Sequence, residues 1–421
     1  MIKDIDLFEQ RNKEQRNQIG MHIEKLEKNL TSTKLEYIDY LKKKEFYDIE
    51  YRDNIADTVL LIGGSGYFGI HLLKALVERQ TPCIYILSRH CDVKEIKKEI
   101  ETLYDNFVLE QMTTKLVCIQ GDISCKNFGL SSEQYQKLLN QVDVVINLAA
   151  NMSESGKYFD FYSTNVAGVR NIIYFMKHSG KEGELFQAST IGVSEGEEFG
   201  KEYSFMGEYT WNVERNYDYV GLHHNYYMTK NLAEKEVNLA REEGLKVNIF
   251  RFGNIGFCSK TGKFSVAGQT TSIIRLIKSF VKMGIMPGDQ EKVIDLTYVD
   301  DLADAVARIV ANRSNLASNK IYHLTNEQYY SFQDLASIFN VKTCNSSEIW
   351  SILKDKIRDK DYKNDINNIL QYYLQANGLE TTKTLIASDC TVKRLRSIHF
   401  LWKRITNDSF ALFAQRLLKE M

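Results

Sequence analysis

The chain has 421 residues, of which 43% are apolar and 26% charged, a composition typical of a folded globular protein rather than a disordered or fibrous one. Its 54 basic and 55 acidic residues leave a formal net charge of −1, without the basic field that favours nucleic-acid binding. The start of the chain is polar, and no apolar stretch approaches the roughly 20 residues of a membrane helix. These features predict a soluble, cytoplasmic protein that has room for two domains and has no nucleic-acid or membrane partner.

The first segment, residues 1–57, is rich in Lys, Glu, Gln and Asn and contains a single glycine, Gly20. Its apolar residues recur at helical spacing in two runs, separated by Thr31-Ser32-Thr33. The pattern predicts two amphipathic helices. They are interpreted either as a solvated cap on the main domain or as a docking arm, the remnant of a connection to an upstream domain.

Residues 58–256 alternate short apolar runs with segments of helical periodicity. The apolar runs cover 58–64, 83–89, 115–122, 142–150, 184–190 and 246–254. Strands that are apolar throughout and alternate with helices indicate a parallel sheet covered on both faces. The fold class predicted is therefore α/β, a Rossmann-like doubly wound parallel sheet.

Residues 257–421 have a different pattern and predict a mainly helical C-terminal subdomain. Helical periodicity covers 270–284 and 300–312, and most of the tail after Ser331. One β-rich run, 320–326, is expected to return to the edge of the sheet. We expect this subdomain to bind the substrate and its carrier domain.

A glycine-rich turn joins the first predicted strand to the first helix of the sheet domain. Such a turn lets the backbone approach a pyrophosphate, and the start of the helix offers free N–H groups to it. Its position between a strand and a helix is the context that makes this motif specific. The cofactor-binding residues predicted here are Gly63, Ser65, Gly66, Tyr67, Phe68 and Gly69.

The second predicted strand ends in Ser88-Arg89, where an NAD-binding protein would carry a carboxylate. The nearest carboxylate is Asp92, and Lys94 follows it. Arginine suits a 2′-phosphate by charge and by bidentate geometry. The pattern favours NADPH over NADH, although a merely solvated Arg89 would give the same sequence.

Other strand ends supply further candidates for the cofactor site. Asp122 is expected to meet the adenine amine, and the end of the fourth strand to lie beside the nicotinamide. The cofactor residues predicted from these ends are Asp122, Ile123, Asn147, Ala149, Phe252 and Asn254.

Tyr226 and Lys230 form a YxxxK motif at the start of a predicted helix, where a spacing of four places both side chains on one face. An ammonium beside a phenol is expected to lower the tyrosine pKa. The strand before this motif ends in Ser189-Thr190, which offers a hydroxyl to orient a substrate carbonyl. Thr190, Tyr226 and Lys230 are the predicted catalytic residues, and Lys230 is also expected to hold the cofactor ribose.

The cysteines and histidines give no metal site. Seven scattered cysteines without a CxxC pair predict reduced thiols and no disulfide framework. The adjacent His223 and His224 have no further ligand at familiar spacing and are interpreted as loop residues near the substrate entrance. They fall with Trp211 in a region, 195–225, that we expect to act as a lid.

From about Tyr51 onward the chain resembles the extended short-chain dehydrogenases, and within them the thioester reductase domains of nonribosomal peptide synthetases and carboxylic acid reductases. Beyond the shared motifs, the stretches 121–150, 159–172, 250–264, 283–306 and 391–406 carry this resemblance. Val193, three residues after Thr190, matches the family spacing and favours Thr190 over Ser189. The chain departs from the family pattern at Gly63, Asn147, Phe252 and Ser265.

The resemblance implies an NADPH-dependent reduction of an acyl or peptidyl thioester held on the phosphopantetheine arm of a carrier domain. Thr190 and Tyr226 would bind the carbonyl oxygen, and Tyr226 would supply the proton. The product implied is an aldehyde, or an alcohol after a second reduction. The resemblance also implies a monomeric domain that continues from a carrier domain upstream of Met1.

Two alternatives remain open. A free-standing dehydrogenase, epimerase or dehydratase would keep Tyr226 and Lys230 but would act on a small carbonyl or a sugar nucleotide. A redox-sensing dinucleotide-binding protein would need no catalytic tyrosine, so Tyr226 counts against it.

Overall fold

The computed structural model describes residues 51–104, 114–153, 157–194, 197–198, 203–206, 225–266, 268–288, 293–316, 318–326, 328–375 and 383–421. The two helices predicted within residues 1–57 lie outside the described residues. So do His223, His224, Trp211 and most of the predicted lid.

A seven-stranded sheet forms the centre of the larger part of the molecule, and every pairing within it is parallel. The strand order is β11-β8-β5-β4-β1-β2-β3. This order confirms the predicted doubly wound sheet, and a late strand, β11, lies at its edge. The strands are β1 (Thr58–Ile62), β2 (Cys83–Ser88), β3 (Lys115–Gln120), β4 (Val144–Asn147), β5 (Glu184–Thr190), β8 (Lys246–Phe252) and β11 (Ile321–Leu324).

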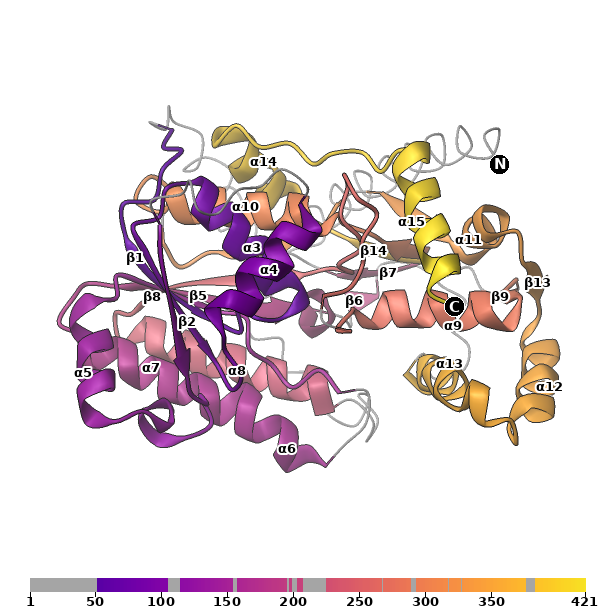
Figure 1. Ribbon diagram of the computed structural model, residues 1–421, viewed down its shortest axis with the longest axis horizontal. Helices are drawn as coiled ribbons and strands as arrows, with labels where there is room; N and C mark the ends of the chain where they lie inside the picture. The colour runs from indigo at the N-terminus through magenta and orange to yellow at the C-terminus, as the bar shows by residue number, and fades with distance from the viewer. Residues whose placement is uncertain are drawn as a thin grey trace.

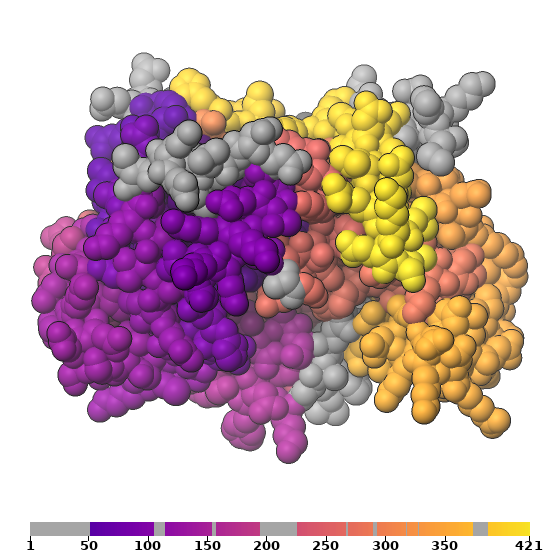
Figure 2. Space-filling view, viewed as in Figure 1, coloured from indigo at the N-terminus to yellow at the C-terminus, as the bar shows by residue number. Residues whose placement is uncertain are grey.

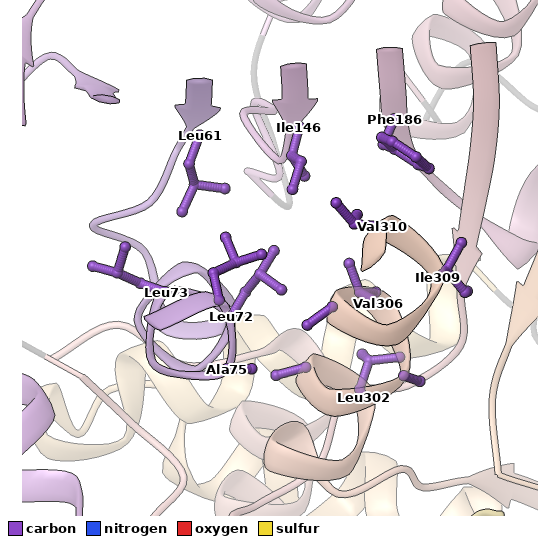
Figure 3. Close-up of a cluster of buried hydrophobic side chains, with 14 of the residues drawn as sticks. Leu61, Leu72, Leu73, Ala75, Ile146, Phe186, Leu302, Val306, Ile309 and Val310 are labelled. Carbon is purple, nitrogen blue, oxygen red and sulfur yellow. The ribbon is translucent and has the colours of Figure 1, made fainter. Parts of the chain in front are cut away.

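Helices cover both faces of this sheet, which is why its strands are apolar throughout (Figure 1). One face packs against α3 (Tyr67–Glu78), α4 (Val93–Leu103) and α10 (Val299–Ala311). The other packs against α5 (Ser132–Gln141), α7 (Gly168–His178) and α8 (Asn225–Glu242). Figure 3 shows Leu61, Ile146 and Phe186 of the strands facing Leu72 of α3 and Val306 of α10.

The C-terminal subdomain has a hydrophobic core of its own and lies beside the sheet domain (Figure 2). Its helices are α9 (Ser272–Met283), α11 (Phe332–Phe339), α12 (Ser346–Lys356), α13 (Lys363–Gln375) and α15 (Asn407–Lys419). The face-to-face rings of Phe257 and Phe413, with centroids 4.4 Å apart, lie in this core.

Short strand pairs add to the predicted helices. They are β9 (Ile285–Pro287) with β13 (Lys342–Cys344), β10 (Val293–Asp295) with β12 (Tyr329–Ser331), and β7 (Tyr203–Met206) with both β6 (Glu197–Glu198) and β14 (Lys383–Ile386). These strands are two to four residues long, too short to give a periodic signal in the sequence.

Residues after 257 contribute to both cores. Helix α10, strand β11 and the segment around α14 (Asp389–Ser397) pack onto the sheet domain, where Leu395 and Phe400 are buried. The chain therefore passes from the sheet domain into the subdomain and back again.

One prediction about the cysteines is wrong. Cys91 and Cys118 form a disulfide, with Cα atoms 5.6 Å apart. The reason is the sheet register: Cys91 folds back over Ile86 of β2, which pairs with Cys118 of the neighbouring strand β3. A separation of 27 residues hides this proximity in the sequence. The other five cysteines remain thiols.

Candidate active site

The glycine-rich turn after β1 has little room for side chains. Gly63 has φ +81°, and a Cβ there would lie 3.0 Å from the Ala149 nitrogen. A Cβ on Gly69 would lie 2.4 Å from the Gly63 carbonyl oxygen, so helix and turn touch through backbone alone. Gly66 precedes helix α3 without a capping side chain. The first N–H groups of α3 are thus not bonded by a capping residue and can bind an anion.

The end of β2 presents an exposed guanidinium beside this turn. The hydroxyls of Ser65 and Ser88 lie 2.8 Å apart, which links the turn to the neighbouring strand. Arg89 is exposed and makes no hydrogen bond or ion pair with another described residue. Asp92, the nearest carboxylate, caps α4 by accepting from the Lys94 and Glu95 backbone nitrogens. Its main role is therefore structural.

The aromatic residues of the turn point into the protein. Tyr67 is buried and its hydroxyl donates to the Gly256 carbonyl at 2.8 Å. The rings of Phe68 and Phe252 are in edge contact, with centroids 5.1 Å apart. These three side chains join the turn to the segment at the end of β8.

Asp122 and Ile123 shape the end of β3. Asp122 accepts from both the backbone nitrogen and the hydroxyl of Ser124 through one carboxylate oxygen, Oδ1. Ile123 is buried against Gly168, where an added Cβ would lie 2.7 Å from its Cδ1. Ile123 therefore supports α7 with its side chain.

Asn147 and Asn254 are both held within the protein. Asn147 is fully buried, donates to Gln187 at 3.0 Å and accepts from the Ala149 nitrogen at 3.1 Å. Its side chain thus fixes the loop after β4. Asn254 donates to the Asp295 carboxylate through its backbone nitrogen and its side-chain amide. Asp295 was not predicted as a site residue.

Ser189 and Thr190 point to opposite sides of β5, as adjacent strand residues do. The Ser189 hydroxyl is buried and donates to Glu234. Thr190 is half-buried, and its hydroxyl accepts from the Gly192 nitrogen at 3.3 Å. The geometry favours Thr190 as the hydroxyl available to a substrate.

Tyr226 and Lys230 lie in the first turns of α8, which packs against β5. Lys230 is buried, and its ammonium donates to the Ala188 carbonyl at 2.6 Å, two residues before Thr190. Burial lowers the pKa of Lys230 to about 8, and the Glu234 carboxylate opposes this change.

The expected lowering of the Tyr226 pKa is not found. The side chain as a whole is half-buried, but desolvation raises the pKa of the phenol above its ordinary value, and Tyr227 adds to the rise. A protonated phenol can donate a hydrogen bond and a proton, which a reduction needs. The ring of Tyr227 packs on Gly192, where a Cβ would lie 2.3 Å from it.

Asn165 is a buried site residue that the sequence motifs did not reveal. It lies in the π-helical turn η3 (Ser163–Ala167) and donates to the Thr229 hydroxyl at 3.0 Å, between Tyr226 and Lys230. It also bonds the backbone of Asn151 in both directions. Asn165 therefore ties the loop after β4 to the helix of the catalytic motif. A buried asparagine in a short π-helical turn leaves no periodic signal.

The described part of the chain contains neither a membrane-spanning helix nor a metal-binding cluster. Within it, no helix is long and apolar enough to cross a membrane. The same residues bring together no group of three His, Cys, Asp or Glu side chains that would hold a metal ion.

The fold and the glycine-rich turn define a Rossmann-like dinucleotide-binding protein of the short-chain dehydrogenase type. Residues 61–306 match the model of an NAD-binding family described as "Male sterility protein". The chain belongs to this family.

Several relatives are much longer than this chain. Glycine betaine reductase ATRR of Emericella nidulans is 26% identical over 284 residues, 64% of this chain and 21% of that protein. A linear gramicidin synthase of Brevibacillus parabrevis is 27% identical over 290 residues, 68% of this chain and 5% of that protein. Probable polyketide synthase 44 of Dictyostelium discoideum is 35% identical over 144 residues, 33% of this chain and 5% of that protein. This chain therefore spans a small part of each.

Solved structures share the fold over nearly the whole chain. The terminal R domain of the myxalamid PKS-NRPS pathway has a TM-score of 0.72 at 22% identity, covering 92% of this chain and 98% of that one. A thiolation-reductase di-domain from an archaeal non-ribosomal peptide synthetase has a TM-score of 0.71 at 21% identity, covering 94% and 82%. The resemblance to terminal reductase domains inferred from the sequence is confirmed.

Proposed function

We propose that this chain is an NADPH-dependent reductase that releases an acyl or peptidyl thioester from a carrier domain as an aldehyde, or as an alcohol after a second reduction. The observation that carries the proposal is the arrangement of Lys230, Tyr226 and Thr190. Lys230 bonds the backbone of β5 two residues before Thr190, and Tyr226 lies one helical turn before Lys230.

The residues around the glycine-rich turn fit a dinucleotide. Gly63 and Gly69 form a cradle that a Cβ would fill, and α3 begins there without a side-chain cap. Arg89 supports NADPH over NADH, because it is exposed while Asp92 is engaged in capping α4. When bound, NADPH supplies the hydride.

The chain's own residues would bind the carbonyl oxygen and move one proton. The Thr190 and Tyr226 hydroxyls would donate to the oxygen as negative charge develops on it. Tyr226, kept protonated by burial, would then give its proton to that oxygen. The resulting hemithioacetal would break its C–S bond, its hydroxyl proton passing to sulfur, to give the aldehyde and the free carrier thiol. The Lys230 ammonium, held on the Ala188 carbonyl, would hold the cofactor ribose and stabilise the phenolate that remains.

A carrier-bound thioester is favoured as substrate over a small free carbonyl. The relatives include peptide and polyketide synthetases, and one similar structure contains a thiolation domain joined to the reductase. Sugar-nucleotide epimerases also share the fold, but one solved with NAD gives a TM-score of only 0.57. Dependence of turnover on the phosphopantetheine arm separates the two functions.

The first test compares Tyr226→Phe with Tyr227→Phe, because each removes one hydroxyl from adjacent rings. Tyr226→Phe should lower kcat by about 10²- to 10⁴-fold while NADPH affinity stays within about threefold. Tyr227→Phe keeps the ring that packs on Gly192 and should retain most of the activity. Equal activity in the two variants would contradict the role given to Tyr226.

A further inference from the structure

Beneath the proposed catalytic lysine lies a buried ion pair that the mechanism above does not use. Glu234 follows Lys230 by one turn of α8, and Arg251 is on β8. The guanidinium binds the carboxylate through two nitrogens, at 3.1 and 2.7 Å. Their side chains are 2% and 6% exposed, so the pair is almost completely removed from water. Such a pair is costly to bury, and replacing it with apolar side chains often leaves stability unchanged.

The carboxylate is held on both sides by residues of the sheet. The Ser189 hydroxyl donates to Glu234 from β5, next to Thr190. Arg251 in turn contacts His323 of β11, whose Nδ1 lies 2.8 Å from the Ala387 carbonyl. Burial and the Arg251 charge lower the pKa of His323 to about 3, so the imidazole is neutral and its Nε2 can accept from Arg251.

We propose that Glu234, fixed by Arg251 and Ser189 one helical turn after Lys230, is a positioning residue that keeps the Lys230 ammonium charged. The proposal rests on the catalytic role given to Lys230 under Proposed function. Without the carboxylate, two buried cations would be left in one site, and the lysine would lose its proton more easily.

Among the described residues, no other charged group is placed to keep the Lys230 ammonium charged. The elements packed against α8 are β5, β8, α6 (Tyr158–Tyr162), α7, η3 and η4 (Ile191–Ser194). On α7, Arg170 pairs with Glu236 and Lys177 with Glu243, so these cations are engaged by outer residues of α8 or by Glu243 just after it. The remaining ionisable groups on these elements are Glu184, Lys246, Tyr158, Asp160, Tyr162, Tyr174 and His178. The charge that acts on the Lys230 pKa is that of Glu234.

The test compares two substitutions that should act in opposite directions. Glu234→Gln removes the carboxylate and leaves the Arg251 cation. The alkaline limb of the kcat/KM profile should therefore shift to lower pH by about one unit. Arg251→Met removes the cation paired with the carboxylate and leaves Lys230 as the nearest cation, so the limb should shift to higher pH by a similar amount. A purely structural role would lower activity at every pH in both variants without moving the limb.

Binding of NADPH gives a second readout that does not need turnover. A charged Lys230 is expected to hold the cofactor ribose, so the Kd for NADPH, measured by fluorescence, should increase at pH values above the alkaline limb. In each variant, the pH at which the Kd increases should shift in the same direction as the limb. If wild-type protein binds NADPH but reduces no thioester, the proposed function fails while this readout still tests the inference.

One control variant and one double variant distinguish the proposed role from a general loss of structure. Glu184→Gln also neutralises a buried carboxylate on β5, one that accepts from Asn248, and it should leave both limbs in place. If Glu234→Gln does not fold, the double variant with Arg251→Met removes both charges together. It should fold, with a limb below wild type. The proposal would be overturned if neither the kcat/KM profile nor the Kd for NADPH shifted along the pH axis. It would also be overturned if both single variants shifted them in the same direction.

Discussion

Arg89 occupies the position on which the preference for NADPH depends. It is exposed at the end of β2, beside the Ser65–Ser88 contact, and no described residue neutralises it. A charge-assisted hydrogen bond contributes about 1.5–3 kcal/mol. Arg89→Ala should therefore weaken NADPH binding by about 10- to 100-fold and change NADH binding by less than about threefold.

Fluorescence titration with both cofactors measures this ratio. Lys98→Ala, which removes an exposed charge from α4, is the matched control and should leave both affinities unchanged. Equal losses for NADPH and NADH in the Arg89 variant would show that Arg89 does not contact a 2′-phosphate.

Some site residues could be predicted from sequence because their chemistry requires a fixed spacing. Tyr226 and Lys230 are separated by one helical turn, and the glycines of the turn follow a buried strand. Asn165, Asp295 and Glu234 could not be predicted, because their roles come from contacts with residues 14 to 64 positions away in the chain. The burial of Asn147 depends in the same way on Gln187, a neighbour across the sheet.

At the scale of elements, two glycines at the junction of the glycine-rich turn with α3 are needed for different reasons. Gly69 leaves room for the backbone, and Gly66 leaves room for the cofactor. A Cβ on Gly69 would lie 2.4 Å from backbone, whereas a Cβ on Gly66 would meet nothing nearer than 3.5 Å. Gly69→Ala should lower the free energy of unfolding by about 1–3 kcal/mol and weaken NADPH binding. Gly66→Ala should change stability by less than about 1 kcal/mol but still weaken NADPH binding, because its methyl group would stand where the pyrophosphate approaches.

Urea unfolding and NADPH titration of the two variants check this contrast. Normal NADPH affinity in a stable Gly66→Ala protein would place the pyrophosphate elsewhere.

Elements were predictable where the hydrophobic pattern is long. The six strand runs and the late strand all lie in the observed sheet, with ends shifted by zero to three residues. The short strands were not predicted because two to four residues carry no periodic pattern. The Cys91–Cys118 pairing was missed because it depends on the register of β2 against β3.

At the scale of the whole molecule, the end of the chain completes the core of the C-terminal subdomain. Phe413 of α15 is fully buried and stacks on Phe257, which follows β8 by five residues. Phe413→Ala should cost about 3–5 kcal/mol of unfolding free energy through the lost contacts and the cavity. Leu418→Ala on the same helix, at a side chain 50% exposed, should cost less than about 1 kcal/mol.

Denaturant midpoints of these two variants measure the difference. Similar midpoints would mean that α15 is not part of the cooperative unit that contains the end of β8.

The central claim is that this chain reduces a thioester presented by a carrier domain. The most direct measurement is NADPH consumption by the full chain, with one acyl group offered first on carrier-bound phosphopantetheine and then as the free acid, and products identified by mass spectrometry. We predict consumption with the carrier-bound thioester alone, release of the aldehyde or alcohol, and loss of both in Tyr226→Phe. Saturable NADPH binding without consumption on any carrier-bound thioester would contradict this account.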